Sequence, residues 1–229
     1  MTRPTVLLFD IDGTLLLSGG AGRRAISRAF DEVIGAPEVL DNHDFRGMTD
    51  RTLFRAGLAA AGRSMDAALL ERLLDAYIRF LRPELVAAGH FRVLPGVVPL
   101  LDALVHRDAV ALGIGTGNVE QGAWLKLERG RLDHYFEFGG FGDDVENRAE
   151  LVRCGVARGA ARLGCAPADC RVVVIGDSVH DVRAAHDVGA DCVAVQTGGH
   201  PRDELLALGA THVFETLAAP SVLPVLLAQ

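Results

Sequence analysis

The alternation of strand-like and helix-like segments along most of this chain is the feature that most constrains its fold. From Val93 onward, short apolar runs rich in β-branched residues are followed repeatedly by segments with helical spacing. We expect strands at residues 108–114, 136–138, 171–175, 192–196 and 212–214, and helices at 96–106, 118–130, 148–163, after Pro201 and after Pro220. Such βα units predict an α/β fold with a Rossmann-like parallel sheet flanked by helices.

A buried strand at residues 6–9 belongs to the same expected sheet, but a long segment with a different pattern separates it from the rest. In that segment apolar residues recur at helical spacing, most clearly over 69–81, where Asp66 is a plausible N-cap and Pro83 is expected to follow the helix end. An insert at this point would lie over the carboxyl edge of the sheet, where open α/β sheets bind ligands. We therefore predict an α/β core domain of residues 1–17 and 92–229 and an inserted α-helical cap domain of residues 18–91.

Composition limits the class of protein. The 229 residues are 49% hydrophobic, which is enough for a substantial core, and the length fits one large domain or a core with a smaller insert. The formal net charge of -7 argues against nucleic acid as a partner, whereas a small anionic substrate held by local donors remains compatible with it. Monomer and homodimer are both compatible with the sequence.

The cellular location is expected to be the cytoplasm. The N-terminus leads into the first strand without a signal-peptide pattern, and no apolar run approaches the ~20 residues of a membrane span, so no membrane partner is expected. The spacing of the four cysteines fits neither a zinc site nor a redox dithiol, and we expect reduced, mostly buried thiols at Cys154, Cys165, Cys170 and Cys192.

The motif Asp10-Ile11-Asp12-Gly13-Thr14 directly follows the first expected strand. Two carboxylates at i and i+2 just beyond a strand end both reach the mouth of the sheet. Gly13 can adopt the positive φ that turns the chain, and Thr14 brings a hydroxyl and an amide to the same place. Taken alone, the motif is also compatible with an ordinary Asp-Gly turn, while an EF-hand loop fits poorly because Gly stands fourth after a strand.

Later strand ends carry matching polar residues: Thr116 in Gly115-Thr116-Gly117-Asn118, and Asp177 and Asp181 in Gly176-Asp177-Ser178-Val179-His180-Asp181. With these motifs the chain resembles the haloacid dehalogenase (HAD) superfamily. Its phosphatase branch is marked by D-x-D-G-T, a Ser or Thr after a second strand, a basic residue, and G-D-x-x-x-D. The resemblance covers essentially the whole chain, including a helical cap, and is to the phosphoglycolate phosphatase and β-phosphoglucomutase side of the superfamily.

The resemblance implies hydrolysis of a small phosphorylated metabolite, a phosphomonoester. Asp10 would attack phosphorus and form an aspartyl-phosphate, and Asp12 would protonate the leaving alkoxide and later deprotonate the hydrolytic water. Thr116 and the amide of Gly117 would hold a phosphoryl oxygen. Gly13 and Thr14 are further candidates for phosphate binding.

Mg²⁺ is the implied cofactor, because several carboxylates around a phosphate dianion repel one another unless a hard cation intervenes. By resemblance its ligands would be the Asp10 side chain, the Asp12 backbone carbonyl and the Asp177 side chain, with Asp181 nearby or linked through water.

The basic residue departs from the family pattern, in which a Lys usually follows the short third strand. Arg148 is our candidate, with Lys126 in reserve, and a surface arginine paired with a nearby acid is the alternative for residue 148. Asn118 is expected to cap the next helix, with substrate contact as the second interpretation. Arg46 could meet an anionic leaving group or lie solvated on the surface.

Three alternative functions remain open. A sugar-phosphate mutase of the β-phosphoglucomutase type keeps both acids, so the motifs separate it poorly from a phosphatase. A dinucleotide-binding oxidoreductase could use the glycines of residues 113–118, although the last Gly of G-x-G-x-x-G is missing. A noncatalytic interaction protein would have no clear reason to carry both Asp10 and Asp12.

Overall fold

The computed structural model describes residues 3–64, 66–143 and 145–228 and has a six-stranded parallel sheet at its centre. In spatial order the strands are β5 (Gly139–Gly140), β4 (Val110–Gly115), β1 (Thr5–Phe9), β6 (Arg171–Gly176), β7 (Asp191–Val195) and β8 (His212–Phe214). The first strand of the chain therefore lies in the middle, between β4 and β6. The predicted α/β class with a parallel sheet is confirmed.

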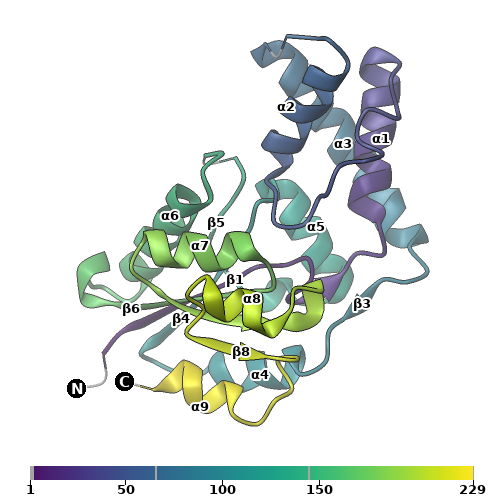
Figure 1. Cartoon of the computed structure of the whole chain (residues 1–229). Coiled ribbons are helices and arrows are strands. Elements are labelled where there is room, and N and C mark those ends of the chain that lie inside the picture. The colour runs from purple at the N-terminus through teal and green to yellow at the C-terminus, as the bar shows by residue number, and fades with distance from the viewer. Residues whose placement is uncertain (1–2, 65, 144, 229) are drawn as a thin grey trace.

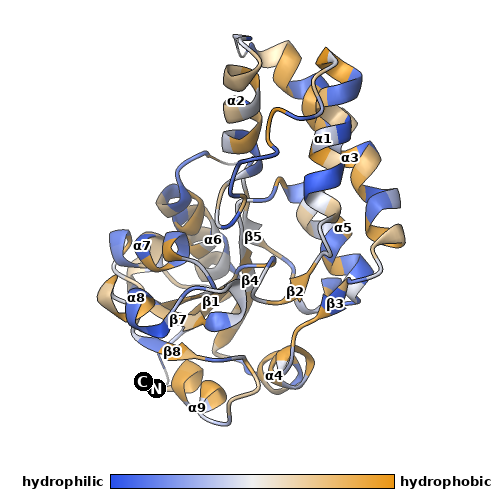
Figure 2. Cartoon of the chain, turned by 45° about the vertical axis from the view of Figure 1, so that its right-hand side comes forward, coloured by the Kyte–Doolittle hydropathy of each residue, from blue (hydrophilic) through white to orange (hydrophobic). Residues whose placement is uncertain are grey.

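Helices cover both faces of this sheet. One core cluster joins it to α4 (Val97–Leu104), α5 (Glu120–Gly130) and α9 (Val222–Leu227), and a second joins it to α6 (Arg148–Arg162), α7 (Val179–Asp187) and α8 (Arg202–Ala207). The side chains of β1 alternate between them, with Leu7 and Phe9 in the first cluster and Val6 and Leu8 in the second. In Figure 2 the ribbons of α4 and α9 are largely hydrophobic, as expected for short helices that mainly cover the sheet.

The helices of residues 18–91, called the helical insert below, gather beyond the end of the sheet that lies opposite both termini (Figure 1). They are α1 (Ala21–Ile34), α2 (Asp50–Ala60) and α3 (Ala67–Ala87), and the antiparallel strands β2 (Leu16–Leu17) and β3 (Arg92–Val93) flank them. Their shared core includes Val119 and Leu125 beside and within α5, so the insert packs on the core of the fold. The division into two domains at these boundaries stays a prediction.

Helix α3 continues through Pro83, so the expectation that it ends before this proline is wrong. Leu81 and Leu85 lie on either side of Pro83, four residues apart, and both are buried in the core of the insert. Fully burying one leucine side chain contributes about 1.5–3 kcal/mol. The two leucines together therefore offset the ~3 kcal/mol that an internal proline costs a helix.

The short third strand of the motif region is also displaced from its predicted place. It is β5 at Gly139–Gly140 and not residues 136–138. A Cβ on Gly139 would lie 2.8 Å from the Ile114 carbonyl oxygen, and one on Gly140 would lie 2.9 Å from the Leu151 carbonyl carbon. Close packing by β4 and α6 selects glycine here, whereas strand propensity favours the aromatic residues that precede it.

The four cysteines are free thiols, of which Cys170 and Cys192 are buried and Cys154 and Cys165 are partly buried. The Sγ atoms of Cys165 and Cys170 lie 2.9 Å apart, a proximity that their spacing in the sequence did not suggest. In the part of the chain that the structure describes, no helix is both long enough and apolar enough to span a bilayer.

Candidate active site

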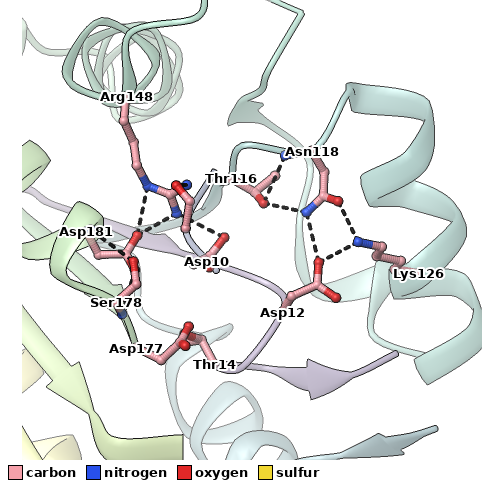
Figure 3. Close-up of polar contacts among 11 residues, drawn as sticks. Asp10, Asp12, Thr14, Thr116, Asn118, Lys126, Arg148, Asp177, Ser178 and Asp181 are labelled. Atoms are coloured by element: carbon pink, nitrogen blue, oxygen red, sulfur yellow. Dashed lines mark hydrogen bonds and ion pairs between the residues drawn. The ribbon is translucent and has the colours of Figure 1, made fainter. Parts of the chain in front are cut away.

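The ends of three adjacent strands form the floor of the site. Because β4, β1 and β6 are neighbours and parallel, Asp10, Thr116 and Asp177 follow their carboxyl ends and meet at one edge (Figure 3). All three are buried, and they line a cavity of about 510 Å³ that is bounded on its far side by residues of the helical insert. The structure thus brings these three predicted site residues together, and their catalytic and metal-binding roles stay predictions.

The turn after β1 depends on Gly13. Its φ is +89°, and a Cβ there would lie 2.6 Å from Cγ of Asp177, so both conformation and space require glycine. The buried hydroxyl of Thr14 donates to Oδ1 of Asp177 at 2.9 Å. Thr14 therefore holds an acid of the site through its hydroxyl, and its part in phosphate binding stays a prediction.

Arg148 reaches the site from the first turn of α6. Its Nε and Nη2 donate to Oδ1 of Asp181 at 3.0 and 2.5 Å, and Nη2 lies 3.2 Å from Oδ1 of Asp10. The other Asp181 oxygen, Oδ2, accepts from the backbone N–H and the hydroxyl of Ser178 at 3.0 and 2.7 Å. Four donors thus hold the carboxylate of Asp181, and Arg148 is not a solvated surface residue: its side chain is 10% exposed.

Lys126 reaches the site from the opposite side, out of α5 (Figure 3). Its ammonium forms an ion pair with Asp12 and donates to Oδ1 of Asn118 at 2.5 Å. Asn118 in turn donates from Nδ2 to Oδ2 of Asp12 at 3.1 Å and to Oγ1 of Thr116 at 2.8 Å. Both basic candidates therefore contact catalytic candidates, but different ones.

The expectation that Asn118 caps the following helix is wrong. The N-cap of α5 is Val119, and no side chain caps it within its own segment. The amide of Asn118 is drawn inward because it can bridge a carboxylate, an ammonium and a hydroxyl at once, and this satisfies a buried amide better than a single cap bond does.

The pKa values of the acids separate them into two kinds. Burial raises the pKa of Asp10 to about 6 although Arg148 opposes the shift, and burial together with the charges of Asp10 and Asp181 raises the pKa of Asp177. Burial acts in the same direction on Asp12, but attraction to Lys126 and hydrogen bonds from Lys126 and Asn118 outweigh it and lower the pKa. Asp12 therefore has a cation of its own, whereas Asp10 shares the guanidinium of Arg148 with Asp181.

The remaining predicted residues differ in position. Thr116 is fully buried and, like Gly117, lines the cavity. Arg46 lies at the rim, where its side chain is 55% exposed and forms an ion pair with Asp44 at 2.7 Å. This exposed position matches the second interpretation from the sequence, a solvated surface arginine. Arg46 nevertheless borders the cavity.

Two cavity-lining residues of the insert were missed from the sequence. Asp50, the first residue of α2, is buried, and burial raises the pKa of its carboxyl to about 6. Tyr77 of α3 is fully buried, and its hydroxyl has no hydrogen-bond partner among the described residues. Helical periodicity marks Tyr77 only as a core residue, and the segment of residues 45–50 drew attention in the sequence through Arg46 and not through Asp50.

The glycines behind the dinucleotide interpretation have a packing role. A Cβ on Gly113 would lie 2.7 Å from Cζ of Phe138, and one on Gly115 would lie 3.2 Å from Cβ of Leu8. These two residues belong to β4 and face neighbouring side chains. They do not form a phosphate-binding turn, which removes the main support for an oxidoreductase.

Comparison with known proteins agrees with this arrangement. A family of haloacid dehalogenase-like hydrolases matches residues 7–195. The chain is 32% identical to a phosphoglycolate phosphatase from Synechococcus elongatus over 92% of both chains, and 29% identical to one from Caulobacter vibrioides over 92% of this chain and 86% of that protein. A solved hydrolase from Pseudomonas syringae superimposes with a TM-score of 0.69 at 26% identity, covering 93% of this chain and 94% of that one. By sequence, fold and the placement of its motifs, the chain belongs to the haloacid dehalogenase-like hydrolases.

Proposed function

We propose that this protein is a Mg²⁺-dependent phosphatase that hydrolyses small phosphomonoesters through an aspartyl-phosphate on Asp10. The observation that carries the proposal is the distribution of charge at the strand ends. Lys126 pairs with Asp12. Three further buried carboxylates, those of Asp10, Asp177 and Asp181, face the single guanidinium of Arg148. Buried charge of this kind requires a counter-charge, and one divalent cation supplies it.

The donor set fits magnesium. Carboxylate oxygens of Asp10, Asp177 and Asp181 lie within 4.8 Å of one another, and all are hard ligands. Because four protein donors already hold Asp181, we assign direct ligation to Asp10, Asp177 and the backbone carbonyl of Asp12, and a supporting position to Asp181. When bound, Mg²⁺ would screen the repulsion between these acids and the substrate phosphate.

Asp10 and Asp12 divide the chemistry. An Asp10 oxygen forms a bond to phosphorus as the bond from phosphorus to the leaving oxygen breaks, and Asp12 gives that oxygen its proton. In the second step Asp12 takes a proton from water as the water oxygen attacks phosphorus and Asp10 leaves. The lowered pKa of Asp12 suits the second step, and the negative charge of a bound phosphate beside it raises the pKa for the first.

The substrate is a small phosphorylated metabolite, and phosphoglycolate is the first compound to test because the relatives carry that activity in their names. Arg148, Thr116 and the amide of Gly117 lie around Asp10 or line the same cavity and would receive the phosphoryl oxygens. A cytoplasmic location, the absence of nucleic acid and membrane partners, and a monomeric or homodimeric state stay predictions from the sequence.

The test is release of p-nitrophenol from its phosphate by wild type and Asp10→Asn, with Mg²⁺ and with EDTA. Asp187→Asn is the matched control, because Asp187 is an exposed acid on α7. We expect Asp10→Asn to lose more than about 10³-fold in kcat and the control to keep its activity. Metal-independent turnover, or robust turnover by Asp10→Asn, would refute the mechanism. A panel of phosphorylated metabolites then identifies the leaving group, and conversion of a hexose 1-phosphate to the 6-phosphate would indicate a mutase instead.

A further inference from the structure

The helical insert contacts the β4–α5 loop, defined here as residues 116–119, through one residue that binds it twice. The backbone N–H of Asp50 donates to the carbonyl oxygen of Gly117 at 2.8 Å. The side chain of Asp50 accepts, through Oδ2, from the backbone N–H of Val119, also at 2.8 Å. This loop contains Thr116 and the amide of Gly117, the proposed donors to the phosphoryl group. The first turn of α2 is therefore attached to the backbone on both sides of Asn118.

Gly117 shows how close this contact is. A Cβ at residue 117 would lie 2.6 Å from the carbonyl oxygen of Met48 and 2.8 Å from Cα of Thr49. Gly117 does not have a positive φ, so the requirement for glycine comes from space and not from backbone conformation. The backbone of the insert rests directly on the loop, and a side chain at residue 117 would separate them.

The side chain of Asp50 is held in place for this contact by its surroundings. Asp50 is the first residue of α2, and Val119 is the N-cap of α5, so its side chain lies at the N-terminal ends of two helices. It is only 5% exposed, and the buried ammonium of Lys126 attracts it. Asp50 is thereby held in one orientation. A residue that positions a loop must be fixed in this way.

We propose that Asp50 is a positioning residue that couples docking of the helical insert to the geometry of the phosphate-binding donors at Thr116 and Gly117. This inference rests on the proposed phosphatase function. Asp50 acts through the loop backbone: it fixes Gly117 from its carbonyl side and Val119 from its amide side. When the insert undocks, the loop loses both restraints, so the donors are held in place only while the cavity is closed over a substrate.

Three variants test the coupling. Asp50→Ala removes the acceptor for the Val119 amide, Asp50→Asn keeps an oxygen acceptor, and Gly117→Ala pushes the insert away from the other side. Arg55→Gln is the control, because Arg55 is also on α2 and joins it to the core through an exposed ion pair with Glu146, but does not touch the loop. Circular dichroism establishes that each variant is folded.

We expect Asp50→Ala and Gly117→Ala to lower kcat for p-nitrophenyl phosphate about 10- to 100-fold, since a displaced oxyanion donor costs about that much or more. Inhibition by orthovanadate, which occupies the phosphate position without a leaving group, should weaken by a similar factor. Asp50→Asn should stay within about threefold of wild type, and Arg55→Gln should be unchanged. The double variant Asp50→Ala/Gly117→Ala should be no worse than the poorer single variant, because both break one contact.

A readout independent of catalysis separates this inference from the proposed function. Amide hydrogen exchange in the peptide covering residues 115–122 should be faster in Asp50→Ala and Gly117→Ala than in wild type, and unchanged in Asp50→Asn. If wild type does not hydrolyse phosphomonoesters but exchange follows this order, the proposed function fails and the coupling stands. If wild type is active while Asp50→Ala keeps wild-type kcat, vanadate affinity and exchange, the coupling is wrong.

Discussion

Replacing Arg148 with methionine should destabilise the protein strongly, because one guanidinium balances two buried acids. Arg148 binds Asp181 through two nitrogens at 2.5 and 3.0 Å and approaches Asp10 to 3.2 Å, and all three side chains are 10% exposed or less. Methionine keeps most of the aliphatic length of arginine but removes the charge and every hydrogen bond. The acids would then lie buried without their counter-charge.

The expected loss is about 3–5 kcal/mol in the free energy of unfolding, the usual effect of removing one partner of a buried ion pair. Removing Asp181 as well should recover part of it, because Asp181→Asn takes away the unbalanced charge. A coupling energy of about 1–3 kcal/mol between the two substitutions is expected for residues in one network. Arg162→Met on the same helix is the matched control: its ion pair with Glu137 is more than half exposed, and such pairs contribute about 0.2–1 kcal/mol.

Urea unfolding at pH 7.5 with EDTA measures these differences without a contribution from bound metal. The five proteins are wild type, Arg148→Met, Asp181→Asn, Arg148→Met/Asp181→Asn and the control Arg162→Met. If Arg148→Met loses less than about 1 kcal/mol, as an exposed pair would, Arg148 does not balance the site. The same result would remove the basis for counting the three acids Asp10, Asp177 and Asp181 against one guanidinium.

Three other changes have defined outcomes. The pKa of Asp50 is raised from 3.8 to about 6, so the contribution of Asp50 to stability is complete below pH 3.8 and is lost as the pH rises through 6. Relative to Asp50→Asn, wild type should therefore lose up to ~3 kcal/mol in the free energy of unfolding between pH 4 and 7. A pH-independent difference between the two proteins in urea unfolding would contradict this. Gly13→Ala should lower the free energy of unfolding by about 1–3 kcal/mol and abolish most activity, because alanine is strained at positive φ and its Cβ would displace Asp177. An unchanged melting temperature would argue against the turn after β1 as described. Adding Mg²⁺ at 100 times its Kd should stabilise wild type by about 2.7 kcal/mol and Asp177→Asn by much less, as measured by calorimetry. An equal stabilisation of wild type and Asp177→Asn would exclude Asp177 as a ligand.

Most of the sheet could be predicted from the sequence, because each buried strand is a short apolar run and the polar residue after it marks its carboxyl end. Asp10, Thr116 and Asp177 followed from this rule, although more than 100 residues separate the first two. The rule fails at β5, where packing by β4 and α6 selects two glycines that carry no strand signal. A strand defined by its neighbours cannot be located from its own residues.

The contacts of the insert were beyond local patterns. Asp50 is at a helix start, where an acid is ordinary, and only the docking of α2 on residues 117–119 gives it a further role. Lys126 is similar: helical spacing places it on the buried face of α5 with Ala123 and Leu127, where an ammonium with a side chain only 5% exposed is rare. Its partner Asp12 lies 114 residues earlier in the chain, so no periodicity relates the two.

Arg148, which departs from the lysine that the resemblance led us to expect, has a geometric explanation in this fold. One guanidinium presents Nε and Nη2 to Asp181, Nη2 to Asp10, and Nη1 to the carbonyl oxygen of Gly47 at 3.3 Å. It thereby joins α7, the end of β1 and the helical insert. The single nitrogen of a lysine cannot span three directions with fixed geometry, because its donors share one centre. Arg148→Lys should therefore retain the charge near Asp10 but lose the contact with the insert. We expect its kcat to fall well below that of wild type, while its free energy of unfolding falls less than that of Arg148→Met. A wild-type kcat in Arg148→Lys, with a loss only in Arg148→Met, would show that charge alone matters.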